Sequence, residues 1–167
     1  EVGFNNSIYL SEKQTADRNF ALAYFMRESG AFPKDSDMLE VLDFYFQGCS
    51  IQMDCSAHSI VAGTFANAGI CPITRERVFS PTTSKNVLSL MYSCGMYDFS
   101  GEFAFTIGIP AKSGVSGALV VVVPGVCGIT IWSPPLDRYG NSVRAVDVCN
   151  RLVEHFNFHN YDNLIPN

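Results

Sequence analysis

The sequence predicts an α+β fold in which helices pack with an antiparallel sheet. Apolar residues recur at helical spacing from the first third of the chain as far as Cys94. From Phe103 the spacing changes to two, which is typical of strands, and short turns separate the apolar runs that follow. After Ser142 the helical spacing returns. A block of helices, then a block of strands, then a helix favours α+β over alternating α/β.

The composition limits the classes of protein to which the chain can belong. Its 167 residues suffice for one compact domain, and 47% apolar against 16% charged residues exclude a disordered chain or a coiled coil. A net charge of -5 argues against a nucleic-acid or anionic-membrane partner. The longest apolar run, Gly117 to Trp132, is broken by Pro124-Gly125 and by Gly128, so each half is too short to cross a bilayer.

Four helices are predicted in the first half from their caps and stops. They run over Asp17–Arg27, from a cap at Ser36-Asp37 to Cys49, from a cap at Asp54 to Gly69, and from a cap at Ser80 to a stop at Gly95. Each carries an apolar stripe that we expect to face inward. The stripes include Phe25, Tyr45, Cys49, Val61, Phe65 and Leu88.

Three strands are predicted next, over Phe103–Ile109, Ala118–Val123 and Val126–Trp132. Since short turns join them, they should pair as antiparallel neighbours. Ser142 caps a last helix, and the tail from Asn157 is expected to be irregular. Three strands make a thin sheet, so we expect further strands either before Glu1 or from a partner.

The cysteines and histidines do not indicate a metal site. The six cysteines lie far apart without a C-x-x-C pair, and we expect buried free thiols. The histidines fall at unrelated places. We interpret His58 as a helix-surface residue and His155 and His159 as structural.

No single motif in the sequence is sufficient for catalysis. Lys112-Ser113-Gly114 matches the K-[ST]-G triplet that lies on the sheet edge beside the site of penicillin-interacting serine enzymes, but alone it is better interpreted as a solvated turn. Tyr97 follows the stop at Gly95 on a predicted loop, where a phenol can transfer protons or simply pack its ring.

Three other residues have structural interpretations when they are taken alone. Glu12 is a carboxylate before a helix, Asn19 is a first-turn amide, and Tyr45 is one aromatic residue in a helical stripe.

Taken in order, longer blocks of the sequence are more specific than any triplet. Seven of them together resemble the glutaminase family, specifically the animal phosphate-activated kind, and they cover almost the whole chain. The blocks are S-E-K-Q-T-A-D-R-N-F-A (Ser11 to Ala21), L-D-F-Y-F-Q (Leu42 to Gln47), I-C-P-I-T (Ile70 to Thr74), S-C-G-M-Y-D-F-S-G (Ser93 to Gly101), P-A-K-S-G-V-S-G (Pro110 to Gly117), S-P-P-L-D (Ser133 to Asp137) and F-H-N-Y-D-N-L (Phe158 to Leu164).

This resemblance implies that residues 1–167 are the C-terminal part of a single glutaminase catalytic domain with a β-lactamase/transpeptidase-like fold. Such a protein hydrolyses L-glutamine to L-glutamate and ammonia through a serine acyl-enzyme, without a metal or organic cofactor. The resemblance also implies dimers or tetramers, activation by inorganic phosphate and residence in mitochondria. Asp17 is then a candidate contact at a subunit interface.

The resemblance also implies roles for five residues. Tyr97 matches the tyrosine that exchanges protons with the nucleophile and its lysine, and the backbone amide of Val115 matches one donor of the oxyanion hole. Glu12 matches the carboxylate that pairs with the α-ammonium of the substrate. Asn19 and Tyr45 match polar contacts to the amino-acid end of the substrate.

The chain departs from the family in one respect, because no S-x-x-K stands at a matching place and Ser93 and Ser113 are not the nucleophile in this interpretation. The chain begins with Glu1 and shows no targeting segment, so we expect a piece of a longer protein that is inactive alone. Two alternatives stay open. One is another serine-acylating hydrolase of the same fold, and the other is a non-catalytic interaction fragment with an exposed strand edge.

Overall fold

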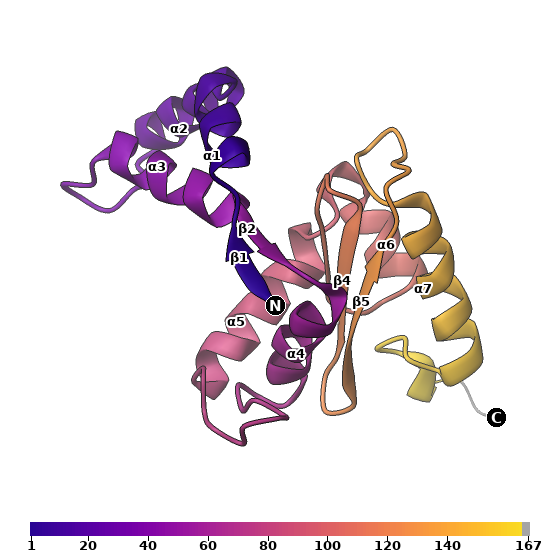
Figure 1. Cartoon of the computed structure of the whole chain (residues 1–167). Helices are drawn as coiled ribbons and strands as arrows, with labels where there is room; N and C mark the ends of the chain where they lie inside the picture. Colours follow the sequence, from indigo (N-terminus) through magenta and orange to yellow (C-terminus); the bar gives the residue numbers. More distant parts are fainter. Residues whose placement is uncertain (165–167) are drawn as a thin grey trace. The chain divides into compact units, whose positions relative to one another are not determined.

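The computed structural model describes residues 1–164, which divide into two compact units, Glu1–Asp54 and the chain from Cys55 onward. Figure 1 colours them in chain order, the first unit in indigo and purple. Each unit has a hydrophobic core of its own, so each is described by itself.

The first unit consists of three helices and a two-stranded antiparallel ribbon. Val2 pairs with Met53 in the ribbon, and the core under the helices contains Leu42 and Phe46. The elements are β1 (Val2–Phe4), α1 (Asn6–Gln14), α2 (Asp17–Glu28), α3 (Met38–Cys49) and β2 (Ile51–Met53).

Side-chain caps explain where the first and third of these helices begin. The Asn5 side chain accepts from the Ile8 N–H at 3.1 Å, and Asp37 accepts from the N–H groups of Leu39 and Glu40. The predictions of α2 and α3 are confirmed, including the cap at Asp37. Helix α1 and both strands were not predicted, and Glu12 lies inside α1 rather than before a helix.

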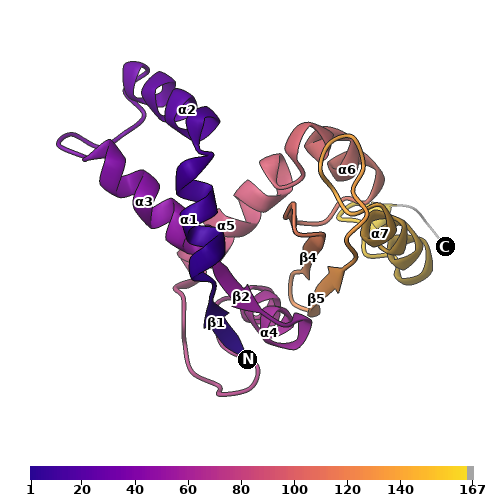
Figure 2. The same ribbon diagram turned by 45° about the horizontal axis from the view of Figure 1, so that its top comes forward.

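The second unit is a three-stranded antiparallel sheet with helices on both faces, as Figures 1 and 2 show for α4 and α7. Alternate residues of its central strand point to opposite faces. Val120 and Val122 pack against α4, whereas Leu119 and Val121 pack with residues of α6 and α7. The elements are α4 (Cys55–Ala66), α5 (Pro81–Cys94), η1 (Tyr97–Phe99), α6 (Ser100–Thr106), β3 (Ala111–Ser113), β4 (Ala118–Val123), β5 (Cys127–Trp132), α7 (Val143–Phe156) and η2 (Asp162–Leu164).

The α+β prediction is confirmed, and so are α5 with its Ser80 cap and Gly95 stop, strand β4, strand β5 within a residue, and α7. The predicted strand Phe103–Ile109 is wrong, because α6 occupies most of that segment. Phe103 and Ile107 are both buried while Phe105 is 84% exposed. Residues four apart share a helix face, so this short alternation fitted either period. The first strand of the sheet lies further on, at Ala111–Ser113.

Several predicted inward positions are also wrong. Phe25, Tyr45 and Val61 are exposed, and on α4 the buried side chains are the small ones, including Ala62 and Ala66. The backbone of α4 approaches β5 so closely that a Cβ at Gly128 would lie 2.2 Å from the Gly63 nitrogen. Small residues therefore face the sheet because a larger side chain has no room there.

The cysteine prediction is only partly correct. All six thiols are free, but only Cys71 and Cys149 are buried, and Cys49, Cys55 and Cys94 are exposed. Burial raises the pKa of the Cys149 thiol to about 12. That thiol therefore stays protonated at neutral pH.

His159 has the structural role that was predicted for it. Its Nδ1 accepts from the Tyr161 N–H at 3.1 Å, so Nε2 carries the proton and donates to the Phe105 carbonyl at 3.2 Å. The ring covers Gly108, where an added Cβ would lie 2.1 Å from the imidazole. These bonds tie the chain after α7 to the end of α6.

Candidate functional site

Tyr97 stands at the start of η1 in a backbone conformation that is unusual for a bulky residue, with φ +54°. Buried side chains hold the peptide groups around it. Ser100 Oγ accepts from the Met96 N–H at 2.9 Å and donates to the Tyr97 carbonyl at 2.7 Å. The Asn141 amide donates to the Met96 carbonyl at 3.3 Å. The left-handed conformation, which costs of order 1–3 kcal/mol, is therefore maintained by its surroundings.

The Lys112-Ser113-Gly114 triplet is not the solvated turn that was favoured for it in isolation. Lys112 and Ser113 belong to β3, an edge of the three-stranded sheet, and Ser113 is 1% exposed. The Tyr97 hydroxyl donates to the Ser113 carbonyl at 3.3 Å, and the Lys112 ammonium donates to the same oxygen. The ammonium nitrogen lies 5.0 Å from the centre of the Tyr97 ring. Lys112 thus joins the candidate site, which the isolated triplet did not establish.

Val115 lies in the tight turn between β3 and β4. The Gly117 N–H donates to the Gly114 carbonyl at 2.9 Å, so that carbonyl points into the turn. Since C=O and N–H point oppositely in a trans peptide, the Val115 N–H points out of the turn. No residue that the structure describes accepts a hydrogen bond from it. This N–H is available to an external acceptor.

Gly140 shows that Tyr97 and Val115 share one surface. A Cβ added at Gly140, where φ is +94°, would lie 3.6 Å from Cε2 of Tyr97 and 3.7 Å from Cγ1 of Val115. Both side chains therefore lie beside the same side of Gly140, in the loop before α7. The structure brings these two predicted residues together although they are far apart in the sequence.

A cavity of about 520 Å³ borders the triplet, between α4, α5 and the sheet. Its wall is mostly apolar, and Lys112, Ser113 and Gly114 line it together with His58. His58 is thus half-buried rather than on the helix surface as predicted, and burial lowers its pKa. The Ser113 hydroxyl is buried and has no hydrogen-bond partner among residues 1–164.

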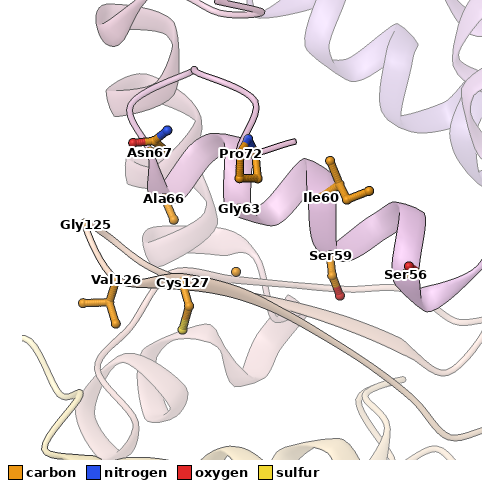
Figure 3. A pocket seen from close by; sticks show the side chains of 11 residues that line it. Ser56, Ser59, Ile60, Gly63, Ala66, Asn67, Pro72, Gly125, Val126 and Cys127 are labelled. Carbon is orange, nitrogen blue, oxygen red and sulfur yellow. The ribbon is translucent and has the colours of Figure 1, made fainter. Parts of the chain in front are cut away.

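A second cavity of about 650 Å³ lies between α4 and the turn that joins β4 to β5. In Figure 3 the side chains of Val126 and Cys127 point away from the helix, and Ser56 and Ser59 lie along it. Neither cavity is lined by any of the five predicted site residues, but only the first is lined by Lys112 and Ser113, which contact Tyr97. The cavity beside Lys112 is therefore the better candidate for the site.

The other three predicted residues lie on separate helices of the first unit. Glu12 on α1 and Asn19 on α2 are half-buried, and Tyr45 on α3 is 53% exposed. Neither the Glu12 carboxylate nor the Asn19 amide has a partner within the described part of the chain. A half-buried carboxylate that pairs with no cation of the protein can bind a positively charged group of a ligand.

The neighbouring lysine does not neutralise Glu12, because it pairs with α3. Lys13 Nζ lies 2.5 Å from Oδ1 of Asp43, and this oxygen also accepts from the Tyr9 hydroxyl at 2.7 Å. The Gln47 amide donates to Oδ2 of Asp43 at 2.8 Å. The bonds to Lys13, Tyr9 and Gln47 lower the pKa of Asp43 to about 2. This network links α1 to α3, the helices that carry Glu12 and Tyr45.

Two further features concern ligands and membranes. Across the described residues, His, Cys, Asp and Glu side chains form no group of three that could hold a metal ion. No helix within residues 1–164 has the length and apolar character needed to cross a membrane.

Comparison with known proteins gives consistent matches over almost the whole chain. The family model described as Glutaminase matches residues 1–161. Putative glutaminase 2 of Caenorhabditis elegans is 58% identical over 99% of this chain and 28% of its own length. The mitochondrial liver isoform of glutaminase from Mus musculus is 56% identical over 98% of this chain and 27% of its own length. The chain thus spans less than a third of these relatives.

Solved structures match as well. The probable glutaminase ybaS superimposes with a TM-score of 0.87 and 33% sequence identity, over 95% of this chain and 50% of that one. The crystal structure of Mglu gives a TM-score of 0.86 and 36% identity, over 95% of this chain and 39% of that one. These matches confirm the predicted fold class, a β-lactamase-like α+β arrangement.

Proposed function

Since this chain belongs to the glutaminase family, we propose that the full-length protein hydrolyses L-glutamine to L-glutamate and ammonia. Residues 1–167 are the C-terminal part of its single catalytic domain in this proposal. The observation that carries it is the arrangement of Tyr97, Lys112 and Ser113 at the sheet edge, near the Val115 N–H, which donates to no residue among 1–164. That arrangement unites a proton-transferring group, a cation and an oxyanion donor.

The proposed chemistry proceeds through an acyl-enzyme. A serine hydroxyl from an S-x-x-K segment outside these residues attacks the side-chain amide carbon, and its proton passes to the amide nitrogen, which leaves as ammonia. Water then attacks the ester, which releases glutamate and restores the serine hydroxyl. Neither step requires a metal or an organic cofactor.

Tyr97 is assigned the proton transfer in both steps. A phenol loses its proton more readily when a cation lies beside the phenolate that forms, and the Lys112 ammonium is close to the ring. The carbonyl of Ser113 accepts from both side chains and so keeps them together. The buried bonds to Ser100 and Asn141 orient the peptide that carries Tyr97.

The backbone N–H of Val115 is assigned to the oxyanion. Negative charge grows on the amide oxygen as the tetrahedral intermediate forms, and a donor fixed by the turn needs no reorganisation to stabilise it. Because the donor belongs to the backbone, the position of the turn matters more than the side chain of Val115.

Glu12, Asn19 and Tyr45 are assigned to the amino-acid end of the substrate. A free amino acid carries a cation and an anion at its α-carbon, so a selective site needs a carboxylate for the first and neutral donors for the second. Glu12 has no competing cation within the described residues, because Lys13 pairs with Asp43.

Assembly, regulation and localisation follow the family in this proposal. We expect a dimer or tetramer with Asp17 at a subunit contact, activation by inorganic phosphate, and a mitochondrial location. The relative from Mus musculus is named a mitochondrial protein, which supports the last point.

The test compares the full-length protein with residues 1–167 alone, and it measures ammonia release from L-glutamine. The full-length protein should release ammonia and the isolated segment should not. Full-length protein that hydrolyses a β-lactam and not glutamine would indicate another serine-acylating hydrolase of this fold. If neither substrate is turned over and the segment associates on a sizing column, an interaction fragment would be the better explanation.

A further inference from the structure

We propose that Trp132 is a positioning residue whose indole N–H holds the β3–β4 turn and thereby the oxyanion donor of Val115. This inference rests on the proposed function, because it concerns the same site. It adds a residue that belongs to a different strand and that no sequence motif indicated.

The contact between Trp132 and the turn is direct. The indole Nε1–H donates to the Ser116 carbonyl at 2.9 Å, and Ser116 follows Val115 in the turn. Trp132 is the last residue of β5 and stands opposite Ala118, the first residue of β4. The Ser133 N–H extends this pairing by donating to the Gly117 carbonyl at 3.0 Å.

The other hydrogen bonds of the turn join backbone groups only: the Gly114 N–H donates to the Ala118 carbonyl at 2.9 Å, and the Gly117 N–H donates to the Gly114 carbonyl at 2.9 Å. Val115 and Ser116 are exposed, and Val115 is 70% exposed, so neither side chain fixes the turn by burial. Glycines bound it on both sides, and Gly117 has φ +89°. A Cβ at Gly117 would lie 2.5 Å from the Ser133 carbonyl, so the turn lies directly on the chain that leaves β5. Side-chain support for Ser116 comes from Trp132.

The exposure of Trp132 agrees with a role in positioning. The side chain is 59% exposed, although it is the one tryptophan of the sequence and a ring of that size usually contributes to a core. More than half of its surface therefore stays in contact with solvent. A hydrogen bond to the turn explains its place at the end of β5 better than packing does.

The bond should act on the transition state rather than on substrate binding. The oxyanion exists only as the amide carbon becomes tetrahedral, so a looser turn weakens a contact that is made then. Complete loss of such a donor typically lowers kcat by about 10²–10³. A donor that is present but misaligned for part of the time should lower kcat less, by about threefold to tenfold on that scale.

The experiment uses the full-length protein with L-glutamine as substrate. Trp132→Phe keeps an aromatic ring and removes the N–H. Incorporation of benzothienylalanine at position 132 keeps the two-ring shape and replaces the N–H by sulfur. Both should lower kcat threefold to tenfold with KM within twofold and an unchanged melting temperature, and both should speed amide exchange in the turn. Tyr161→Phe, at a residue with 58% exposure, is the matched control and should leave kcat unchanged.

The other outcomes separate this inference from the proposed function. Wild-type protein without glutaminase activity overturns the proposed function and this role with it. Active wild type with an unchanged kcat in both variants overturns the role of Trp132 alone. A loss of kcat that follows a loss of melting temperature, or a rise of KM at constant kcat, also overturns it.

Discussion

The Tyr97 hydroxyl and the Lys112 ammonium donate to one acceptor, the Ser113 carbonyl, and the ammonium nitrogen lies 5.0 Å from the centre of the Tyr97 ring. One backbone oxygen thus keeps a phenol and a cation together at the edge of the sheet. The pair unites residues from η1 and β3, which are separate elements. A phenolate formed there would lie beside a positive charge.

Tyr97→Phe tests this arrangement in the full-length protein. Loss of a general acid-base group should lower kcat for L-glutamine by about 10²–10⁴. The ring still packs, so folding should be retained. Tyr92→Phe is the matched control, because the Tyr92 hydroxyl makes only a long bond of 3.4 Å to the Ala104 carbonyl. Initial rates of ammonia release measure both, and a Tyr97 variant with full activity would contradict the assigned role.

Glu12→Gln tests recognition of the substrate α-ammonium. A hydrogen bond to a charged group contributes about 1.5–3 kcal/mol, so kcat/KM should fall by about 10- to 150-fold. Glutaramate, which lacks the α-amino group, should react equally with both proteins. The control is Glu28→Gln, an exposed change at the end of α2. A loss of the same size with both substrates would show that Glu12 does not bind the ammonium.

His58 should make stability depend on pH. Burial lowers its pKa in the folded state, so the unfolded state binds the proton more readily. The contribution of the neutral His58 imidazole to stability is therefore complete above the unfolded-state pKa of about 6.5, and it is lost as the pH falls toward the lower pKa of the folded state. Urea unfolding from pH 7.5 to 5 should show a smaller loss in His58→Gln than in wild type. His155→Gln, at an exposed site, should follow wild type, and equal slopes in all three would refute the prediction.

Gly128→Ala tests the contact of α4 with β5. The added Cβ would lie 2.2 Å from the Gly63 nitrogen, which neither backbone can easily relieve. Overpacking of this kind should destabilise the fold by about 1–3 kcal/mol. Gly101→Ala in α6 has open space and should instead stabilise by about 0.5–1 kcal/mol. Chemical denaturation measures both changes, and a Gly128 variant as stable as wild type would show that the helix shifts freely.

Local signals predicted much of the fold because they act within a few residues. The cap at Ser80, the proline after it and the stop at Gly95 define α5 from neighbouring backbone groups alone. The run of β4 residues buried on both faces was equally clear. The strand predicted from Phe103 was wrong, because seven residues are too few to distinguish a period of two from the period of a helix.

The resemblance assigned roles to five residues of the candidate site, because single residues carry too little local signal to indicate such roles by themselves. Glu12 and Asn19 have ordinary structural interpretations when taken alone. Lys112 belonged to a triplet that resembled a turn, and only its pairing in β3 with Val120 of β4 placed it at a sheet edge. No motif in the sequence indicated a role for Trp132.

The order of amino acids thus decided the caps, the stops, the longest strands and membership of the family, because each depends on short stretches of chain. Tertiary structure decided which distant groups meet. The Tyr97 hydroxyl reaches a carbonyl 16 residues away, and the Trp132 indole reaches Ser116 across the same separation. Such contacts depend on strand register and on the angle at which helices pack, and those quantities result from burying the whole core at once.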